Sequence, residues 1–190
     1  LLNELEQLNL RKNTLIIFAS DNGAAIQAPI KILNCNAGFK GRKGTLYEGG
    51  IRVPFIVNQP GMVPIQTLDN LIYFPDMMPT LAALAKGTKH LPKQINGINI
   101  LPLFYGKQVD TDNRLLYWEF PGKQRAARKG DWKCVTIHPN QPLELYNLKE
   151  DPEETNNLAK KYPRRVKEFD EEMQRMHIPT PNWPQPGEQF

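Results

Sequence analysis

Three polar residues in two separate stretches have side chains that suit the binding of a hard cation and of an anion. Asp21 and Asn22 stand side by side in SDNG, and Lys43 lies within GRKGTLYEGG. A carboxylate next to an amide oxygen offers hard ligands, appropriate to Ca²⁺ or Mg²⁺ and poor for softer metals. An ammonium group in a glycine-rich loop can reach a bound oxyanion as a point charge, while backbone amides approach the same anion.

Each stretch also has a simpler interpretation. Asn22 followed by Gly23 is a favoured tight turn, and Lys43 is compatible with a solvated loop. The element in front of the pair favours a site, because TLIIFA at residues 14–19 is an apolar run typical of a buried strand. Sites in open α/β sheets gather beyond the carboxyl ends of strands. A hairpin turn would be followed at once by a second strand, whereas the irregular AAIQAPIKILNCNAG follows here.

Other charged residues are expected to have supporting roles. Glu48 is placed to hold the loop by accepting hydrogen bonds from backbone or lysine groups, and Arg52 is placed to pair with Glu48. Both are equally explained as an ordinary surface or strand-end ion pair. Glu119 and Arg125 belong to later strands, from which they would reach the rim of a substrate site.

The composition is that of a globular protein without a nucleic-acid or membrane partner. The chain has 190 residues, of which 40% are hydrophobic and 23% charged, and its formal net charge is +4. Its basic residues are dispersed among 20 acidic ones and form no aromatic-interleaved stripe for nucleic acid. No run approaches the roughly 18 apolar residues of a spanning helix. The start LLNELEQLNL lacks a methionine and a signal-peptide pattern, so we expect Leu1 to be a cut within a longer protein.

The pattern of elements predicts an α/β part first. Residues 1–10 have leucines at helical spacing, and the strand at 14–19 is expected to lie parallel to its neighbours in a covered sheet. IRVPFIVNQP predicts another strand, in which Pro54 indicates an edge position, a bulge or a late start. PDMMPTLAALAKG predicts a helix that ends at Gly87.

A smaller α+β part is expected from about residue 110. Four short stretches separated by turn residues predict an antiparallel meander: RLLYWEF, QRAARK, DWKCVTI and PLELYNL. A helix from about Pro163 places Val166, Phe169, Met173 and Met176 on one face, which suits it to cover one side of that sheet.

The order of these motifs resembles the C-terminal portion of the type I sulfatases, the arylsulfatase-like branch of the alkaline phosphatase superfamily. TLIIFASDNG, GFKGRKGTLYEGGIRVPFIV, DMMPTLAALA, INGINILPLFYG, ARKGDWKCV and LELYNLKEDPEETNNLA follow one another in this order. The resemblance implies an alkaline-phosphatase-like α/β fold. Residues 1–109 would be the C-terminal part of the large α/β catalytic domain. Residues 110–190 would form a small C-terminal domain with an antiparallel sheet, a helix and a Pro-rich tail.

The same resemblance implies roles for the three residues. Asp21 and Asn22 match the pair that ligates the active-site calcium, with magnesium less favoured, and Lys43 matches the catalytic lysine that contacts the sulfate. The family nucleophile is a formylglycine made from a cysteine or serine in Cys/Ser-x-Pro-x-Arg. Neither Cys35 nor Cys134 stands in such a motif, so the nucleophile is expected upstream of this chain. The chain alone should therefore be inactive and complete its site with the upstream remainder of the catalytic domain.

The implied function is hydrolysis of sulfate esters, on a sulfated small molecule or glycan, in the periplasm, outside the cell or in lysosomes. Two other functions stay open. One is hydrolysis of phosphate or phosphonate esters by a member of the same superfamily. The other is a noncatalytic module that binds anionic glycans through Lys40, Arg42 and Lys43.

Overall fold

The chain forms two compact units in a computed structural model that describes residues 1–120, 124–138 and 140–182. The first unit comprises Leu1–Ala19 with Pro54–Asp112, and the second comprises Ser20–Val53 with Asn113–Phe190. Residues 20–53 thus make most of their contacts with the C-terminal part of the chain and belong to the same unit as it. The expected domains 1–109 and 110–190 concern the complete protein and stay a prediction. The last eight residues of the Pro-rich tail lie outside the described residues.

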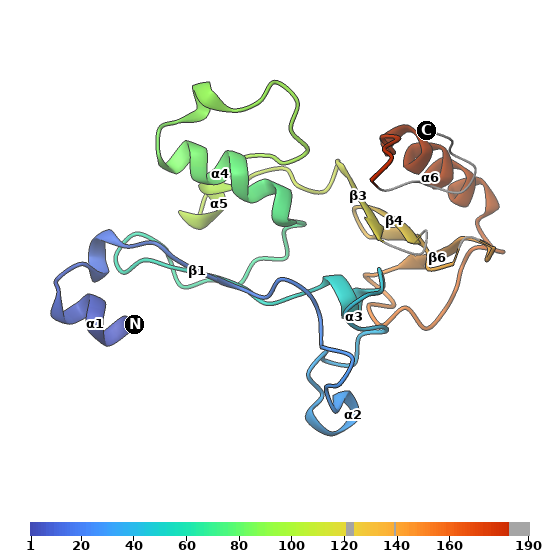
Figure 1. Cartoon of the computed structure of the whole chain (residues 1–190), viewed down its shortest axis with the longest axis horizontal. Coiled ribbons are helices and arrows are strands. Elements are labelled where there is room, and N and C mark those ends of the chain that lie inside the picture. The colour runs from blue at the N-terminus through green and yellow to red at the C-terminus, as the bar shows by residue number, and fades with distance from the viewer. Residues whose placement is uncertain (121–123, 139, 183–190) are drawn as a thin grey trace. The chain divides into compact units, whose positions relative to one another are not determined.

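The first unit packs short helices against one face of a two-stranded sheet (Figure 1). Its elements are α1 (Leu2–Gln7), η1 (Arg11–Asn13), β1 (Ile16–Ala19), β2 (Phe55–Asn58), η2 (Phe74–Asp76), α4 (Met77–Leu84), η3 (Thr88–His90) and α5 (Leu101–Phe104). Ile17 and Val57 face each other across the sheet and pack on the buried side chains of Ile100, Leu103 and Phe104. This apolar cluster is the core of the unit. INGINILPLFYG contains the short helix α5.

The expectation of a parallel strand at 14–19 was wrong for the chain described here. β1 pairs antiparallel with β2, and Ala19 faces Phe55, so that the connecting segment leaves and re-enters the sheet at one end. A parallel partner would require a crossover to the other end. On the face away from the core, Phe18 is 60% and Ile56 is 57% exposed. β2 begins only after Pro54, whose nitrogen has no hydrogen to donate, which confirms the expected late start.

The second unit is built on a four-stranded antiparallel sheet in the order β3-β4-β5-β6. Its elements are α2 (Ile30–Leu33), α3 (Glu48–Ile51), β3 (Leu115–Phe120), β4 (Gln124–Lys129), β5 (Trp132–Thr136), β6 (Glu144–Asn147) and α6 (Pro163–Met176). Consecutive strands are hydrogen-bonded neighbours, which confirms the predicted meander. None of the helices within the described ranges is both long and apolar enough to cross a membrane.

The two faces of this sheet have different coverings. On one face Ala127, Cys134 and Leu145 pack against Phe169 and Met173 of α6, which confirms the predicted covering helix. On the other face, a second cluster joins side chains of the sheet to those of the loop that follows Lys43: Leu46, Tyr47, Ala126, Val135, Tyr146 and Leu148. The sheet is therefore a platform with a helix on one side and the Lys43 loop on the other.

Candidate functional site

The SDNG turn and the Lys43 loop lie against each other in the second unit. The backbone N–H of Gly23 donates to the carbonyl of Gly50 at 2.9 Å, and the N–H of Lys43 donates to the carbonyl of Ala24 at 2.9 Å. Two stretches about twenty residues apart are thereby joined by backbone hydrogen bonds at the last residue of the turn and at the residue after it. The segments that carry the three predicted site residues are thus neighbours.

Glycines make this contact possible because no side chain would fit between the two backbones. An ideal Cβ on Gly23 would lie 1.8 Å from the carbonyl oxygen of Gly49. Within the loop itself, one on Gly50 would lie 2.0 Å from the carbonyl oxygen of Thr45. Gly44 has a φ of +90°, in the left-handed half of conformational space that glycine tolerates best. The glycine-rich composition of GRKGTLYEGG therefore reflects close packing of the loop.

Gly23→Ala is expected to destabilise the protein by about 1–3 kcal/mol, because the new methyl group overlaps the backbone of Gly49. Chemical denaturation of the complete protein measures this change. Gly87→Ala is the matched control, since its ideal Cβ lies 3.8 Å from the nearest atom, the carbonyl oxygen of Ala82. Equal stabilities of the two variants would show that the turn and the loop are not in contact.

The side chains of the predicted residues differ in how they are held. The Lys43 side chain is exposed, and in the described part of the chain no hydrogen bond or ion pair of its ammonium is found. Ser20 Oγ donates to the carbonyl of Asn22 at 2.8 Å, which stabilises the turn. Asn22 Nδ2 donates to the carbonyl of Gly23 at 3.2 Å, so the amide oxygen is the atom that can ligate a cation. The Asp21 side chain is exposed at the start of the same turn.

The oxygen atoms of Asp21 and Asn22 are suitable ligands for calcium, but two residues supply only some of the ligands that the ion needs. Both residues offer oxygen, the ligand that calcium prefers, but a calcium ion takes roughly 6–8 oxygen ligands. Among residues 1–120, 124–138 and 140–182, no three His, Cys, Asp or Glu side chains are grouped closely enough to hold a metal. Asp21 and Asn22 would therefore supply only part of a calcium shell.

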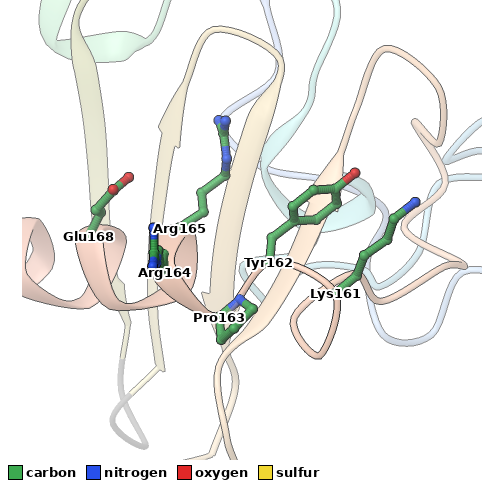
Figure 2. A pocket seen from close by; sticks show the side chains of 6 residues that line it. All are labelled: Lys161, Tyr162, Pro163, Arg164, Arg165 and Glu168. Atoms are coloured by element: carbon green, nitrogen blue, oxygen red, sulfur yellow. The ribbon is translucent and has the colours of Figure 1, made fainter.

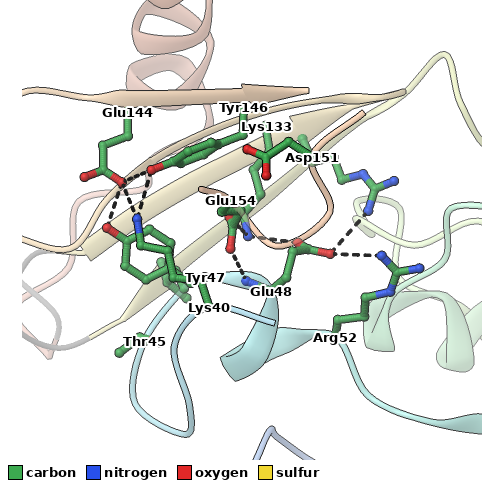
Figure 3. Close-up of polar contacts among 12 residues, drawn as sticks. Lys40, Thr45, Tyr47, Glu48, Arg52, Lys133, Glu144, Tyr146, Asp151 and Glu154 are labelled. Atoms are coloured by element: carbon green, nitrogen blue, oxygen red, sulfur yellow. Dashed lines mark hydrogen bonds and ion pairs between the residues drawn. The ribbon is translucent and has the colours of Figure 1, made fainter. Parts of the chain in front are cut away.

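Glu48 is the centre of a buried cluster of charges beneath the loop (Figure 3). Lys133 Nζ lies 2.9 Å from Glu48 Oε1 and 2.9 Å from Glu154 Oε1, and all three side chains are at most 3% exposed. Arg52 and Arg128 each lie 3.7 Å from Glu48 Oε2. Burial raises the pKa of Glu154, an effect that the nearby Lys133 opposes. The expected support role of Glu48 and its pairing with Arg52 are confirmed, although Glu48 is buried and not part of a surface pair.

The start of the loop is held by a second polar cluster. Lys40 Nζ lies 2.9 Å from the Tyr146 hydroxyl and 3.4 Å from Glu144 Oε2, which also accepts hydrogen bonds from Tyr47 and Tyr146 at 2.7 and 2.6 Å (Figure 3). Burial acts to raise the pKa of Glu144, but the two tyrosine hydrogen bonds and Lys40 outweigh it, and the pKa is lowered. Lys40 is thus engaged within the protein and not directed at an outside anion.

Folding lowers the pKa of Glu144, so its ionised carboxylate stabilises the native state. This stabilisation is fully present at pH values above the pKa that Glu144 has in the unfolded chain. It is lost as the pH falls through the lower pKa of the folded protein. The difference in unfolding free energy between the protein and its Glu144→Gln variant should therefore shrink as the pH falls from about 6 to about 3. Denaturant titrations at several pH values measure it. Glu150→Gln, an exposed control, should show a much smaller pH dependence, and equal behaviour of both variants would contradict the role of Glu144.

The buried lysine was missed by the sequence analysis although a signal was present. Lys133 lies on the same side of the chain as Val135 and Ile137, so a charge stands at the start of an apolar alternation. Such a position requires a buried partner. The partners, Glu48 and Glu154, lie 85 and 21 residues away, and no local pattern points to them.

Two other features of the second unit serve α6 and not the Lys43 loop. Glu119 Oε1 lies 2.6 Å from Nδ1 of His177, just after α6, and Arg125 lies 3.5 Å from Asp170 on that helix, so neither forms the expected substrate rim.

A shallow pocket at the start of α6 is lined by Lys161, Tyr162, Pro163, Arg164, Arg165 and Glu168 (Figure 2). Asp21, Asn22 and Lys43 do not line it.

The fold is that of the sulfatases. A solved structure from work on the metabolism of multiple glycosaminoglycans by Bacteroides thetaiotaomicron superposes with a TM-score of 0.80 at 30% identity, over 92% of this chain and 41% of that one. A second, of i-CgsB in complex with a neocarrahexaose, has a TM-score of 0.78 at 26% identity, over 98% of this chain and 42% of that one. The expected α/β, alkaline-phosphatase-like fold class is confirmed.

Sequence comparison identifies the family. The family described as N-sulphoglucosamine sulphohydrolase, C-terminal, matches residues 39–178, and the chain belongs to it. A sulfatase of Formosa agariphila is 32% identical over 81% of this chain, and an N-acetylgalactosamine-6-O-sulfatase of Bacteroides thetaiotaomicron is 30% identical over 90% of it. The chain spans only 30% and 38% of the lengths of these two relatives. The resemblance to the C-terminal portion of the sulfatases is thereby confirmed.

Proposed function

We propose that this chain is the C-terminal portion of a sulfatase that hydrolyses sulfate esters of glycans, with Lys43 at the sulfate and Asp21 and Asn22 at a calcium ion. The observation that carries the proposal is the contact of the SDNG turn with the Lys43 loop through Gly23 and Gly50. Glycans are favoured as substrates because a relative 30% identical over most of this chain is named an N-acetylgalactosamine-6-O-sulfatase. As in the family, the enzyme would act in the periplasm, outside the cell or in lysosomes.

Each residue has a defined task in this proposal. Lys43 binds the sulfate group of the ester, and its charge stabilises the transition state more strongly as negative charge grows on the leaving oxygen. Asp21 and Asn22 would hold a calcium ion, which would supply Lewis-acid stabilisation of the sulfuryl oxygens. The reaction adds water across the sulfur–oxygen ester bond and yields an alcohol and inorganic sulfate.

In this proposal the nucleophile is the formylglycine that the resemblance to the sulfatases implies, located outside this chain. Neither cysteine of this chain is suited to replace it. Cys134 is buried, and burial raises the pKa of its thiol to about 12, so that it stays protonated and unreactive near neutral pH. Cys35 is exposed but lies in NCNAG, which lacks the proline and arginine of the modification motif.

Two measurements on the complete protein test the proposal. Turnover of an aryl sulfate should exceed that of the aryl phosphate with the same leaving group by at least about 100-fold in kcat/KM. Peptide mass mapping should find an aldehyde in place of a thiol or hydroxyl in a Cys/Ser-x-Pro-x-Arg peptide upstream. A preference for the phosphate ester together with an unmodified residue would contradict the proposal and favour a phosphoester hydrolase.

A noncatalytic module that binds anionic glycans is supported less well. Of the three cations considered for it, Lys40 is paired with Glu144 and Tyr146 inside the protein, which leaves Arg42 and Lys43 exposed. Two exposed cations on one loop form a weak and strongly salt-screened binding surface.

A further inference from the structure

The Lys43 loop is attached to the β-sheet by polar groups at both of its ends and beside Lys43 itself. These attachments involve side chains that lie far from Lys43 in the sequence. They are of three kinds: the Lys40 cluster at the start of the loop, a glutamine beside Lys43, and the buried charges at Glu48.

Gln124, the first residue of β4, holds the backbone next to Lys43. Its Nε2 donates to the carbonyl of Gly44 at 2.8 Å, and its Oε1 accepts the N–H of Leu46 at 3.2 Å. Gln124 is buried, with 9% of its surface exposed. A single amide therefore satisfies a backbone acceptor and a backbone donor of the loop and fixes its course just after Lys43.

Lys133 of β5 joins the end of the loop to the sheet. Glu48 accepts a hydrogen bond from Lys133 through its carboxylate, and its backbone N–H donates to Glu154 Oε2 at 2.7 Å (Figure 3). Lys133 in turn lies 2.9 Å from Glu154 Oε1, so that the three residues form a closed ring of contacts. Both the side chain and the backbone of Glu48 are thereby fixed.

The turn that presents Glu154 is itself constrained. Asp151 accepts the N–H groups of Thr155 and Asn156 at 3.0 and 2.8 Å, and Glu154 has a φ of +56°. A non-glycine residue in this region is uncommon and persists where the surroundings require it. The arrangement directs a carboxylate into the protein, toward Lys133.

Stability alone does not account for a buried lysine with two glutamates. Apolar groups of similar volume serve as well or better in a core, whereas removal of one partner leaves a buried charge unpaired. Apolar side chains lie beside Lys133 on this face of the sheet, and Ala126 and Val135 are fully buried there. The ionic contact restrains the loop, because a shift of Glu48 would leave the buried Lys133 with one partner fewer.

We infer that Lys133, acting with Glu154 through Glu48, is a positioning residue that holds Lys43 at the sulfate of the substrate. This inference rests on the proposed function. Only four residues lie between Lys43 and Glu48, and Gln124 holds the backbone between them. The four-stranded sheet of the second unit therefore fixes the position of the loop that carries the substrate-binding lysine.

Lys133→Met in the complete protein should lower kcat/KM for an aryl sulfate by at least about 10-fold per folded molecule. Lys43→Ala combined with Lys133→Met should be within about 3-fold of Lys43→Ala alone, because both changes remove the same contribution. Met173→Ala is the control, since Met173 is fully buried on the opposite face of the sheet and its loss destabilises the protein without reaching the loop. Its activity per folded molecule should be unchanged. Multiplicative effects of the Lys43 and Lys133 changes would overturn the inference.

Hydrogen exchange gives a readout that does not depend on activity. Exchange of the amides of Lys43, Thr45 and Leu46 should accelerate at least about 10-fold in Lys133→Met and not in Met173→Ala. Unchanged exchange in Lys133→Met would overturn the inference even in an active sulfatase. Accelerated exchange in a protein that hydrolyses no sulfate ester would instead contradict the proposed function and leave Lys133 as the support of the loop. If Lys133→Met does not fold, Lys133→Met with Glu154→Gln removes one charge of each sign and should show the same accelerated exchange.

Discussion

Lys43→Ala in the complete protein is expected to lower kcat for a sulfate ester by about 10²–10³-fold, the usual cost of removing one group that stabilises transition-state charge. KM should rise as well, because the ammonium also binds the substrate. The fold should be unaffected, since the Lys43 side chain is exposed and the alanine keeps the backbone N–H that donates to Ala24.

Two further variants make this result specific. Lys43→Arg keeps the charge but replaces a compact ammonium by a planar guanidinium, so its activity should lie between that of the wild type and that of the alanine variant. Lys149→Ala removes an exposed lysine elsewhere in the same unit and should leave turnover unchanged. Full activity of Lys43→Ala with a normal melting curve would exclude Lys43 from the site.

Asp21→Ala is expected to weaken calcium binding by the complete protein at least about 100-fold, because even the groups that only orient metal ligands are worth about 10–100-fold in affinity. Isothermal calorimetry of the metal-free protein with calcium measures this without any substrate. Asp131→Ala, which removes an exposed carboxylate from the same unit, should bind calcium as the wild type does. Wild-type affinity of Asp21→Ala would place the calcium ion on other residues.

Most elements of the second unit could be predicted from sequence because their patterns are local. The four strands of the meander, and a helix with Phe169 and Met173 on its buried face, follow from period-2 and helical spacing within a few residues. The predicted candidates Asp21, Asn22 and Lys43 also follow from short motifs. Their roles in catalysis stay predictions that the variants described above will test.

Patterns within a few residues did not predict features that depend on contacts with a distant part of the chain. An apolar run such as TLIIFA indicates a strand but not the direction of the neighbour, and β1 pairs antiparallel with β2. A charged residue such as Lys133 in an otherwise apolar strand indicates that a buried partner is needed, but it does not indicate which residue that partner is. Glu119 and Arg125 offered no pattern that would distinguish the α6 face of the sheet from the face that carries the Lys43 loop.

The sequence by itself determined the order of the strands and of the longer helices, the glycine-rich loop and the chemistry of its lysine, because spacing and residue type act over a few positions. The tertiary structure alone decided that Gly23 packs on Gly49 and that Lys133 reaches Glu48 from 85 residues away. The physical reason is that a buried charge needs a partner, and a close backbone contact needs a second segment. Both partners come from distant parts of the sequence and meet only when the chain folds.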